Sequence, residues 1–214
     1  MNAWQTIAVA TLSYLLGSVS FAWILAKKIA GVDLRTVGSG NLGATNAGRL
    51  LGRKWAVAIY LLDFAKGFAP VVVLRRAFGD PAGPATVPVS IVAGLAAFLG
   101  HCLPVWHGFR GGKGVATASG VITALTPRAA GIVFLVFGLA VALSRRISVG
   151  SVAAAAALPL VHYLLREGSA TNEHAASWTL ALYGILAIAV IFRHRQNLRR
   201  LFRGEEPRIG ARKP

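Results

Sequence analysis

Long apolar runs separated by short basic segments make up most of the chain. A membrane-spanning helix needs roughly 20 predominantly apolar residues, with about 17 to 25 as the usual range. Five runs meet or approach this length, and they predict spanning helices over residues 3–26, 55–74, 84–103, 148–165 and 177–192. The hydropathy pattern therefore predicts an all-α polytopic membrane protein.

A further apolar run, over residues 115–143, is too long for one ordinary span. It contains Thr126, Pro127 and Arg128 near its middle. Proline removes a backbone donor and disfavours helix in the residue before it. The run is therefore either one kinked helix or two short helices broken at these residues.

The placement of the basic residues favours two helices, because cytoplasmic loops of membrane proteins carry an excess of Lys and Arg. With seven spans and the uncharged N-terminal segment outside, the cytoplasmic segments hold 18 of the 23 Lys and Arg residues. These segments are 27–54, 104–114, 144–147 and 193–214. With six spans the Arg-rich C-terminal segment would be exported. We therefore expect seven transmembrane helices, with the N-terminus outside and the C-terminus in the cytoplasm.

The composition limits the partners of the protein. The chain carries 23 Lys and Arg against 7 Asp and Glu, yet 55% of its residues are hydrophobic. Because the basic residues lie between apolar runs, they fit anionic headgroups and substrates better than nucleic acid. A single cysteine, Cys102, leaves no pair for a disulfide, and the acidic residues form no cluster for Mg²⁺. We expect one membrane domain over residues 1–203, a polar basic tail over residues 204–214, contact with membrane lipid, no nucleic acid, no metal and no cofactor.

Residues 38–49, which we call the first loop, read GSGNLGATNAGR. Glycines expose backbone N–H groups, and hydroxyl and amide side chains beside them can surround phosphate oxygens while an arginine neutralises the charge. A flexible linker is the alternative, but a linker does not require so dense a set of polar groups. The candidate phosphate ligands are Gly38, Ser39, Gly40, Asn41, Thr45, Asn46 and Arg49.

Residues 104–114, which we call the second loop, end in Arg110, Gly111, Gly112 and Lys113 just before a predicted helix. Two cations among glycines favour an anion, and so do the N–H groups and the dipole of a helix start. Two such loops on one predicted membrane face indicate two phosphate-bearing substrates.

The two loops resemble two nucleotide-binding motifs, but neither loop meets all the requirements of its motif. Residues 38–43 satisfy G-x-G-x-x-G, but they lie between two spans instead of inside a βαβ unit. In the second loop, His107 and Gly114 occupy the positions where a Walker A motif needs Gly and Ser or Thr. The sequence therefore argues against both a dinucleotide site and an ATP site.

Asp63 and Lys66 lie three residues apart on one face of the second predicted span. Ionisable residues inside a membrane are costly, so these two either pair with each other or shape the buried base of the site. The segment 194–203 has its own two interpretations, which are a basic amphipathic helix lying on anionic lipid or a direct role in the site.

Taken together, these segments resemble the acyl-phosphate:glycerol-3-phosphate acyltransferases of bacterial inner membranes. The first loop fits the family pattern GSGNxGATNxxR throughout, and residues 63–67 fit its DxxKG. Residues 100–117 fit GHxFPxFxxFKGGKGVAT, with Leu103, Trp106 and Arg110 in place of Phe, Phe and Lys. An Arg in place of Lys can change how a phosphate is gripped, because a planar fork replaces a point charge. Residues 197–201 and 204–206 follow the order of the family's C-terminal segment.

The resemblance implies transfer of a fatty acyl group from acyl phosphate to the 1-hydroxyl of glycerol 3-phosphate. The products would be lysophosphatidic acid, a phospholipid precursor, and inorganic phosphate. It also implies a multi-pass enzyme of the bacterial inner membrane whose active site faces the cytoplasm, and we expect a monomer. Thioester-dependent glycerolipid acyltransferases use a His with an Asp five positions later, and no His of this chain has that partner.

In the expected site, the first loop surrounds one phosphate and Arg110 and Lys113 hold the other, although the two could be exchanged. His101 or the substrate's own phosphate, whose second pKa is about 6, could accept the hydroxyl proton. We expect four catalytic residues, which are Ser39, Arg49, His101 and Lys113. The expected binding residues outside these four are Gly38, Gly40, Asn41, Thr45, Asn46, Lys66, Arg110, Gly111, Gly112, Ser148, Ser151, His194 and Asn197.

A small transporter of anionic metabolites is the best alternative from another functional class. Its substrate site should lie near the bilayer midplane between inverted repeats. The polar motifs here map to one predicted face, and the sequence contains no evident repeat. A purely structural membrane subunit would leave the two anion-binding loops unexplained.

Overall fold

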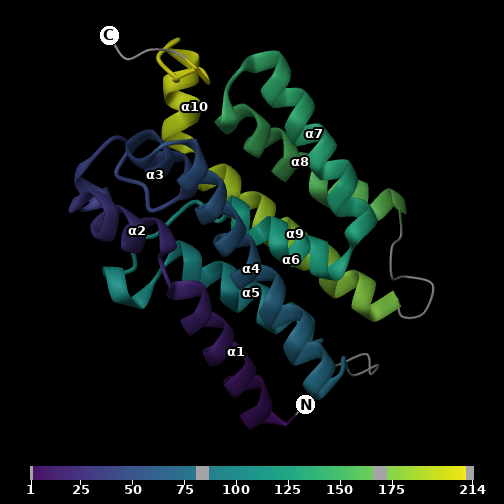
Figure 1. Cartoon of the computed structure of the whole chain (residues 1–214). Helices are drawn as coiled ribbons and strands as arrows, with labels where there is room; N and C mark the ends of the chain where they lie inside the picture. The colour runs from purple at the N-terminus through teal and green to yellow at the C-terminus, as the bar shows by residue number, and fades with distance from the viewer. Residues whose placement is uncertain (1, 81–86, 166–172, 211–214) are drawn as a thin grey trace. The chain divides into compact units, whose positions relative to one another are not determined.

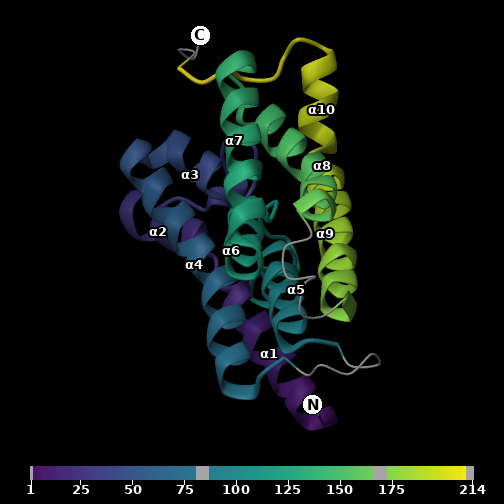
Figure 2. The ribbon, with the colours of Figure 1, turned by 90° about the vertical axis from the view of Figure 1, so that its right-hand side faces the viewer.

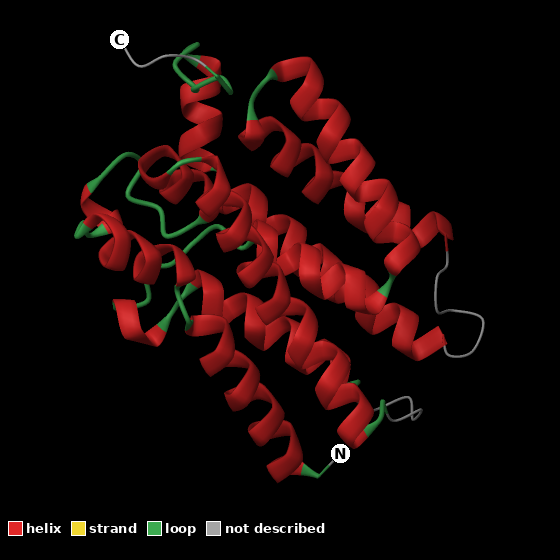
Figure 3. Cartoon of the chain, viewed as in Figure 1, coloured by secondary structure: helices red, strands yellow, loops and turns green. Residues whose placement is uncertain are grey.

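The computed structural model describes residues 2–80, 87–165 and 173–210, and every regular element in these ranges is a helix (Figure 3). Within the described ranges, six helical segments are long and apolar enough to cross a membrane. The prediction of an all-α membrane protein is therefore confirmed. Seven spans and the orientation of the termini stay predictions.

The chain divides into two compact units, Met1–Leu125 and Thr126–Pro214, which we call unit 1 and unit 2 (Figure 1). The α-helices of unit 1 are α1 (Ala3–Ser18), α2 (Phe21–Ala30), α3 (Ala44–Leu51), α4 (Arg53–Phe78), α5 (Val89–Cys102) and α6 (Val115–Leu125). Unit 1 also contains two short 3-10 helices, η1 (Leu34–Thr36) and η2 (Val105–His107). The helices of unit 2 are α7 (Pro127–Ser144), α8 (Ile147–Leu165), α9 (Glu173–Arg193) and α10 (Arg195–Phe202).

The first apolar run, which predicted one helix over residues 3–26, is interrupted between α1 and α2. Val19 lies in the extended region, with φ −66° and ψ 118°, and Ser20 is also outside the helical region. The side chain of Lys66 donates a 2.6 Å hydrogen bond to the carbonyl of Val19. A break inside a spanning segment is tolerated when the freed backbone groups find partners, and Lys66 supplies one of them.

The run over residues 115–143 forms two helices, α6 and α7, separated at Thr126. Pro127 occupies the first turn of α7, where its missing N–H costs nothing. At about 1.5 Å per residue, the 11 residues of α6 measure about 16 Å, roughly half of a hydrocarbon core. The break occurs where the proline predicted it, but α6 is shorter than an ordinary span.

Glycines bring the helices of unit 1 into close contact. A Cβ added at Gly17 of α1 would overlap the backbone of Ala97 in α5, and one added at Gly100 of α5 would overlap the backbone of α1. In α6, a Cβ at Gly120 would overlap the carbonyl of Phe64 in α4. Small residues let helix backbones approach closely in membranes, where packing is the main source of association.

A buried apolar cluster anchors α3 and the segment before it. Leu34, Leu42 and Ala47 are almost fully buried together with Ile59 of α4. Figures 1 and 2 show α3 beside the first turns of α4. This cluster fixes the first loop to the longest helix of unit 1.

In unit 2, α8 packs against both α7 and α9. Thr126, which precedes α7, shares a 2.6 Å hydrogen bond with the hydroxyl of Tyr183 in α9. The buried His162 ring lies nearly perpendicular to the Tyr183 ring, with 5.1 Å between the ring centroids. These polar contacts tie the beginning of α7 to the other two long helices of the unit.

Candidate active site

The first loop is held in shape by the buried side chain of Asn46. Its Oδ1 accepts a 3.0 Å hydrogen bond from the backbone N–H of Ser39. Its Nδ2 donates to the carbonyls of Leu34, at 3.3 Å, and Val37, at 3.0 Å. Because all three partners are backbone groups, the amide of Asn46 positions the loop.

Two glycines of the first loop have left-handed backbone conformations, with φ +61° at Gly38 and φ +67° at Gly40. A Cβ at Gly38 would overlap Oδ1 of Asn46, so only glycine fits beside the amide. Between the two glycines, Ser39 is exposed, as are Thr45 and Arg49 of α3. The loop therefore turns three polar side chains toward its surroundings while Asn46 stays inside.

Residues 44–49 of the first loop form the beginning of α3. Gly43 is the N-cap residue, and among the described residues no side chain caps this end of the helix. The first N–H groups of a helix have no intrahelical carbonyl to bind, and they carry a partial positive charge. The predicted phosphate ligands therefore stand beside a helix end that favours an anion.

The second loop folds back onto the last turn of α5. The N–H groups of Gly111 and Gly112 donate 3.1 Å hydrogen bonds to the carbonyls of Cys102 and His101. Gly112 lies directly against the His101 ring, because an added Cβ would overlap Nε2. Lys113, the next residue, is half-buried. The predicted residues of this loop and His101 therefore form one compact structure.

An aromatic contact joins the segments that carry the two loops. The rings of Trp23 in α2 and His107 in η2 lie with their centroids 4.9 Å apart. Trp23 also donates a 3.2 Å hydrogen bond to Asp33, which precedes the first loop. Hydrogen bonds from Arg35 hold the pKa of the Asp33 carboxyl well below its usual range. The first and second loops thus belong to one packed unit.

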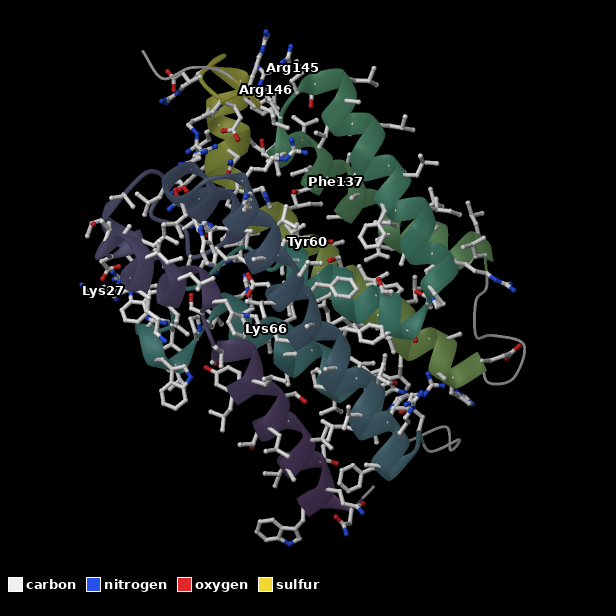
Figure 4. All side chains as sticks on the ribbon, in the orientation of Figure 1. Lys27, Tyr60, Lys66, Phe137, Arg145 and Arg146 are labelled. Atoms are coloured by element: carbon white, nitrogen blue, oxygen red, sulfur yellow. The ribbon has the colours of Figure 1, made fainter. Side chains whose placement is uncertain are left out.

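A buried charge cluster lies beneath the second loop. Nζ of Lys66 lies 2.9 Å from Oδ1 of Asp63, and Nδ1 of His101 lies 3.6 Å from the same oxygen. All three side chains are buried, and Figure 4 labels Lys66 in unit 1. The pairing of Asp63 with Lys66 agrees with one of the two interpretations of their spacing. The contact with His101 was not predicted.

The other predicted residues, Ser148, Ser151, His194 and Asn197, lie in unit 2. Ser148 Oγ and Asn197 Nδ2 each donate a 2.7 Å hydrogen bond to Oε1 of Glu206. Ser151 Oγ donates to the carbonyl of Ile147, and His194 Nδ1 lies 2.8 Å from the carbonyl of Val190.

Glu206 is a buried carboxylate that sequence reasoning left without a role. Arg200 Nε donates a 2.9 Å hydrogen bond to its Oε2, and Arg146 Nε donates 3.2 Å to its carbonyl. Figure 4 labels Arg146 at the turn between α7 and α8. Burial raises the pKa of Glu206, but the hydrogen bonds from Asn197, Ser148 and Arg200 lower it further, so the net pKa is below the usual value. The residues after α10 are therefore anchored at Glu206.

Comparison with known proteins identifies the family. A family model described as glycerol-3-phosphate acyltransferase matches residues 7–204. The chain belongs to the glycerol-3-phosphate acyltransferase family. A family member from Anaeromyxobacter dehalogenans is 44% identical over 199 residues, which cover 92% of this chain and 93% of the relative.

Solved structures of another family member have the same fold. They are crystal structures of PlsY (YgiH), an integral membrane glycerol 3-phosphate acyltransferase. The glycerol 3-phosphate form has a TM-score of 0.83 and 39% identity over 96% of both chains. The lysophosphatidic acid form has a TM-score of 0.81 and 38% identity over 96% of this chain and 95% of that chain. The family resemblance of the motifs is confirmed, and this acyltransferase is an integral membrane protein of lipid biosynthesis.

The structure of this acyltransferase adds contacts between residues that the motifs did not predict. The contact of Asp63 with His101 joins α4 to α5, and the contact of Glu206 with Asn197 joins residues nine positions apart across the end of α10. Asp63 was marked in the sequence by its costly placement inside a span and by the DxxKG pattern, but neither signal predicted its contact with His101. Glu206 lies in the segment 204–206 that resembles the family, but the resemblance predicted neither a role nor a partner for its carboxylate.

Proposed function

We propose that this protein transfers a fatty acyl group from acyl phosphate to the 1-hydroxyl of glycerol 3-phosphate, and releases lysophosphatidic acid and inorganic phosphate. Both loops with the composition of phosphate sites occur in one packed unit, joined through Trp23 and His107, and this observation carries the proposal. The relative PlsY, solved in a glycerol 3-phosphate form and a lysophosphatidic acid form, supports the same acceptor and product.

The chemistry of an acyl phosphate suits a site of this kind. The 1-hydroxyl oxygen attacks the acyl carbonyl carbon, the bond from that carbon to the phosphate oxygen breaks, and phosphate leaves with the electron pair. The hydroxyl proton passes to a base. Because phosphate is a good leaving group, the protein mainly has to gather two anions, orient them and stabilise developing negative charge.

The residues available for these tasks divide between the two loops. Ser39, Thr45 and Arg49 are exposed around the N-terminus of α3, so they can bind one phosphate together with the free N–H groups. Arg110 and Lys113 supply positive charge for the other phosphate. Which substrate each loop holds stays open, because both substrates carry a phosphate. His101 is one candidate for the base, and the acceptor's own phosphate is the other.

We place the enzyme in the bacterial inner membrane as a monomer, with seven spans and the active site facing the cytoplasm. The excess of Lys and Arg in the segments next to both loops supports this orientation. Cysteines introduced at Lys28 and Trp4 would test it, because only the first should react with a membrane-impermeant thiol reagent added to inverted vesicles. Labelling of Trp4→Cys alone would reverse the orientation.

The decisive experiment is a phosphate-release assay on the purified protein in detergent. Acyl phosphate with glycerol 3-phosphate should give equal amounts of inorganic phosphate and lysophosphatidic acid. Acyl-CoA and acyl carrier protein, tested in parallel as donors, should give no lysophosphatidic acid. Turnover with a thioester and none with acyl phosphate would contradict the proposed donor, whereas a transporter would give neither product.

A further inference from the structure

The carboxylate of Asp63 has two charged or ionisable neighbours that come from different parts of unit 1. Oδ1 lies 2.9 Å from Nζ of Lys66, one turn later in α4, and 3.6 Å from Nδ1 of His101 in the last turn of α5. Asp63 is 2% exposed, so water does not screen these contacts. One buried oxygen therefore acts on two side chains.

Neutralising Lys66 does not account for the position of the His101 ring. A carboxylate facing Nδ1 of a histidine favours the ring form with its proton on that nitrogen, and it fixes the ring's direction. The opposite ring nitrogen, Nε2, then points away from Asp63. In this structure Nε2 lies directly against Gly112 of the second loop.

The contacts continue from His101 into the anion-binding segment. Gly112 N–H donates to the carbonyl of His101, so the backbone and the ring of one residue hold the same glycine. Lys113 follows Gly112 directly, and Gly114 has a positive φ of +83°. A rotation of the His101 ring would thus displace the backbone that carries the ammonium group of Lys113.

We propose that Asp63 is a positioning residue of the reaction, whose carboxylate orients His101 against Gly112 and thereby sets the position of Lys113. Its pairing with Lys66 offsets the cost of a buried charge but is not its functional role. The inference rests on the proposed function, because it is tested through KM and kcat of acyl transfer.

The first variant is Asp63→Asn, which keeps the size of the side chain and removes its charge. We expect KM for the substrate held by Lys113 to rise on the order of tenfold, while kcat and KM for the other substrate change less. Asp80→Asn is the matched control. Asp80 pairs with Arg75 at 3.0 Å and accepts from Ser90 in the first turn of α5, away from His101, so its kinetic constants should match those of the wild type.

Two double-mutant cycles separate positioning from charge neutralisation. If Asp63 acts through His101, Asp63→Asn should change kcat/KM by less than about twofold in a His101→Gln background. In a Lys66→Gln background the loss on adding Asp63→Asn should persist at nearly full size. Any other pattern overturns the proposal, and a loss that disappears only in the Lys66→Gln background would assign Asp63 to charge neutralisation.

The design also covers variants that fold poorly. Asp63→Asn alone leaves the Lys66 ammonium buried without its carboxylate, which can destabilise the protein. Neither Lys66→Gln nor Asp63→Asn/Lys66→Gln contains the unpaired ammonium, and in Lys66→Gln the Asp63 carboxylate keeps His101 as a neighbour at 3.6 Å, so the comparison of these two variants decides even if Asp63→Asn alone does not fold. If the wild type releases no phosphate from acyl phosphate, the proposed function fails, and this outcome is distinct from an unfavourable cycle in an active enzyme.

Discussion

The Oδ1 atom of Asn46 accepts a 3.0 Å hydrogen bond from the backbone N–H of Ser39, and this bond closes the first loop onto the first turn of α3. Ser39 is exposed, so its side chain is available to a ligand. Asn46 is buried, and its side chain holds the backbone of Ser39 in place. The loop therefore separates ligand binding from loop support, although its sequence suggested phosphate ligands at both positions.

Asn46→Ala should lower stability and weaken substrate binding together. It leaves one N–H and two carbonyls without their partner, and each unsatisfied buried group costs about 1–3 kcal/mol. Asn46→Asp keeps the acceptor for Ser39, but it loses both donors and adds a buried charge. It should therefore also be less stable than the wild type. Thermal unfolding in detergent and KM for both substrates measure the two effects. Unchanged KM values in a destabilised Asn46→Ala protein would contradict a link between loop shape and binding.

Gly112→Ala should inactivate the enzyme more than Gly108→Ala. A Cβ at position 112 would overlap Nε2 of His101, whereas one at position 108 meets nothing within 4 Å. Gly108 has φ +60°, so alanine there costs about 1–2 kcal/mol of backbone strain without a clash. We expect kcat/KM to fall by about 100-fold for Gly112→Ala and by less than about threefold for Gly108→Ala. Equal losses would show that contact with His101 does not matter.

The close approach of α4 and α6 predicts a large stability difference between two helical glycines. Gly120→Ala would place a methyl group against the carbonyl of Phe64 and force the helices apart. Gly138→Ala in α7 meets nothing within 4 Å, so it should be neutral or stabilise by about 0.5–1 kcal/mol through helix propensity. The midpoint of thermal unfolding in detergent should fall for the first variant only. A stable Gly120→Ala protein would contradict this packing.

The sequence predicted the helical class, the apolar segments and the break before Pro127, because length, hydropathy and proline chemistry are local properties. It did not predict the interruption at Val19, because Gly and Ser are common inside transmembrane helices, so Gly17, Ser18 and Ser20 do not mark a break by themselves. That interruption depends on Lys66, a residue that lies 47 positions away and donates to the freed carbonyl.

The site shows the same division between local and distant information. Phosphate-binding composition is visible in the first loop because glycines, hydroxyls and an arginine are adjacent in the sequence. The partners of Asn197 and His101 are not visible, because Glu206 and Asp63 approach them only in the folded chain. Asn46 was predicted to belong to the site but not to support the loop, since an amide can bind a ligand or a backbone equally well.

The buried carboxylate of Glu206 predicts an acid-sensitive unit 2. Its pKa in the folded state lies below the usual value of 4.5. Deprotonated Glu206 therefore stabilises the fold above the unfolded-state pKa, and this contribution is lost as pH falls through the folded-state pKa. Glu206→Gln should be less stable than the wild type at pH 7, and the difference should shrink as pH falls below 4.5. Thermal unfolding across this range measures it. Parallel pH curves for the two proteins would contradict the linkage.

Separate neutralisation of the two loop cations should reduce turnover by orders of magnitude in a folded protein. Arg49 and Lys113 are outside the buried core, so Arg49→Gln and Lys113→Gln should unfold near the wild-type temperature. Each would leave one phosphate without its charge-assisted partner, and such bonds are about twice as strong as neutral ones. Arg53→Gln, at an exposed position beginning α4, is the matched control and should keep full activity. Full activity of either loop variant would refute that loop as a phosphate site. An equal loss in Arg53→Gln would show that the loss comes from the lower net charge of the protein and not from the loop.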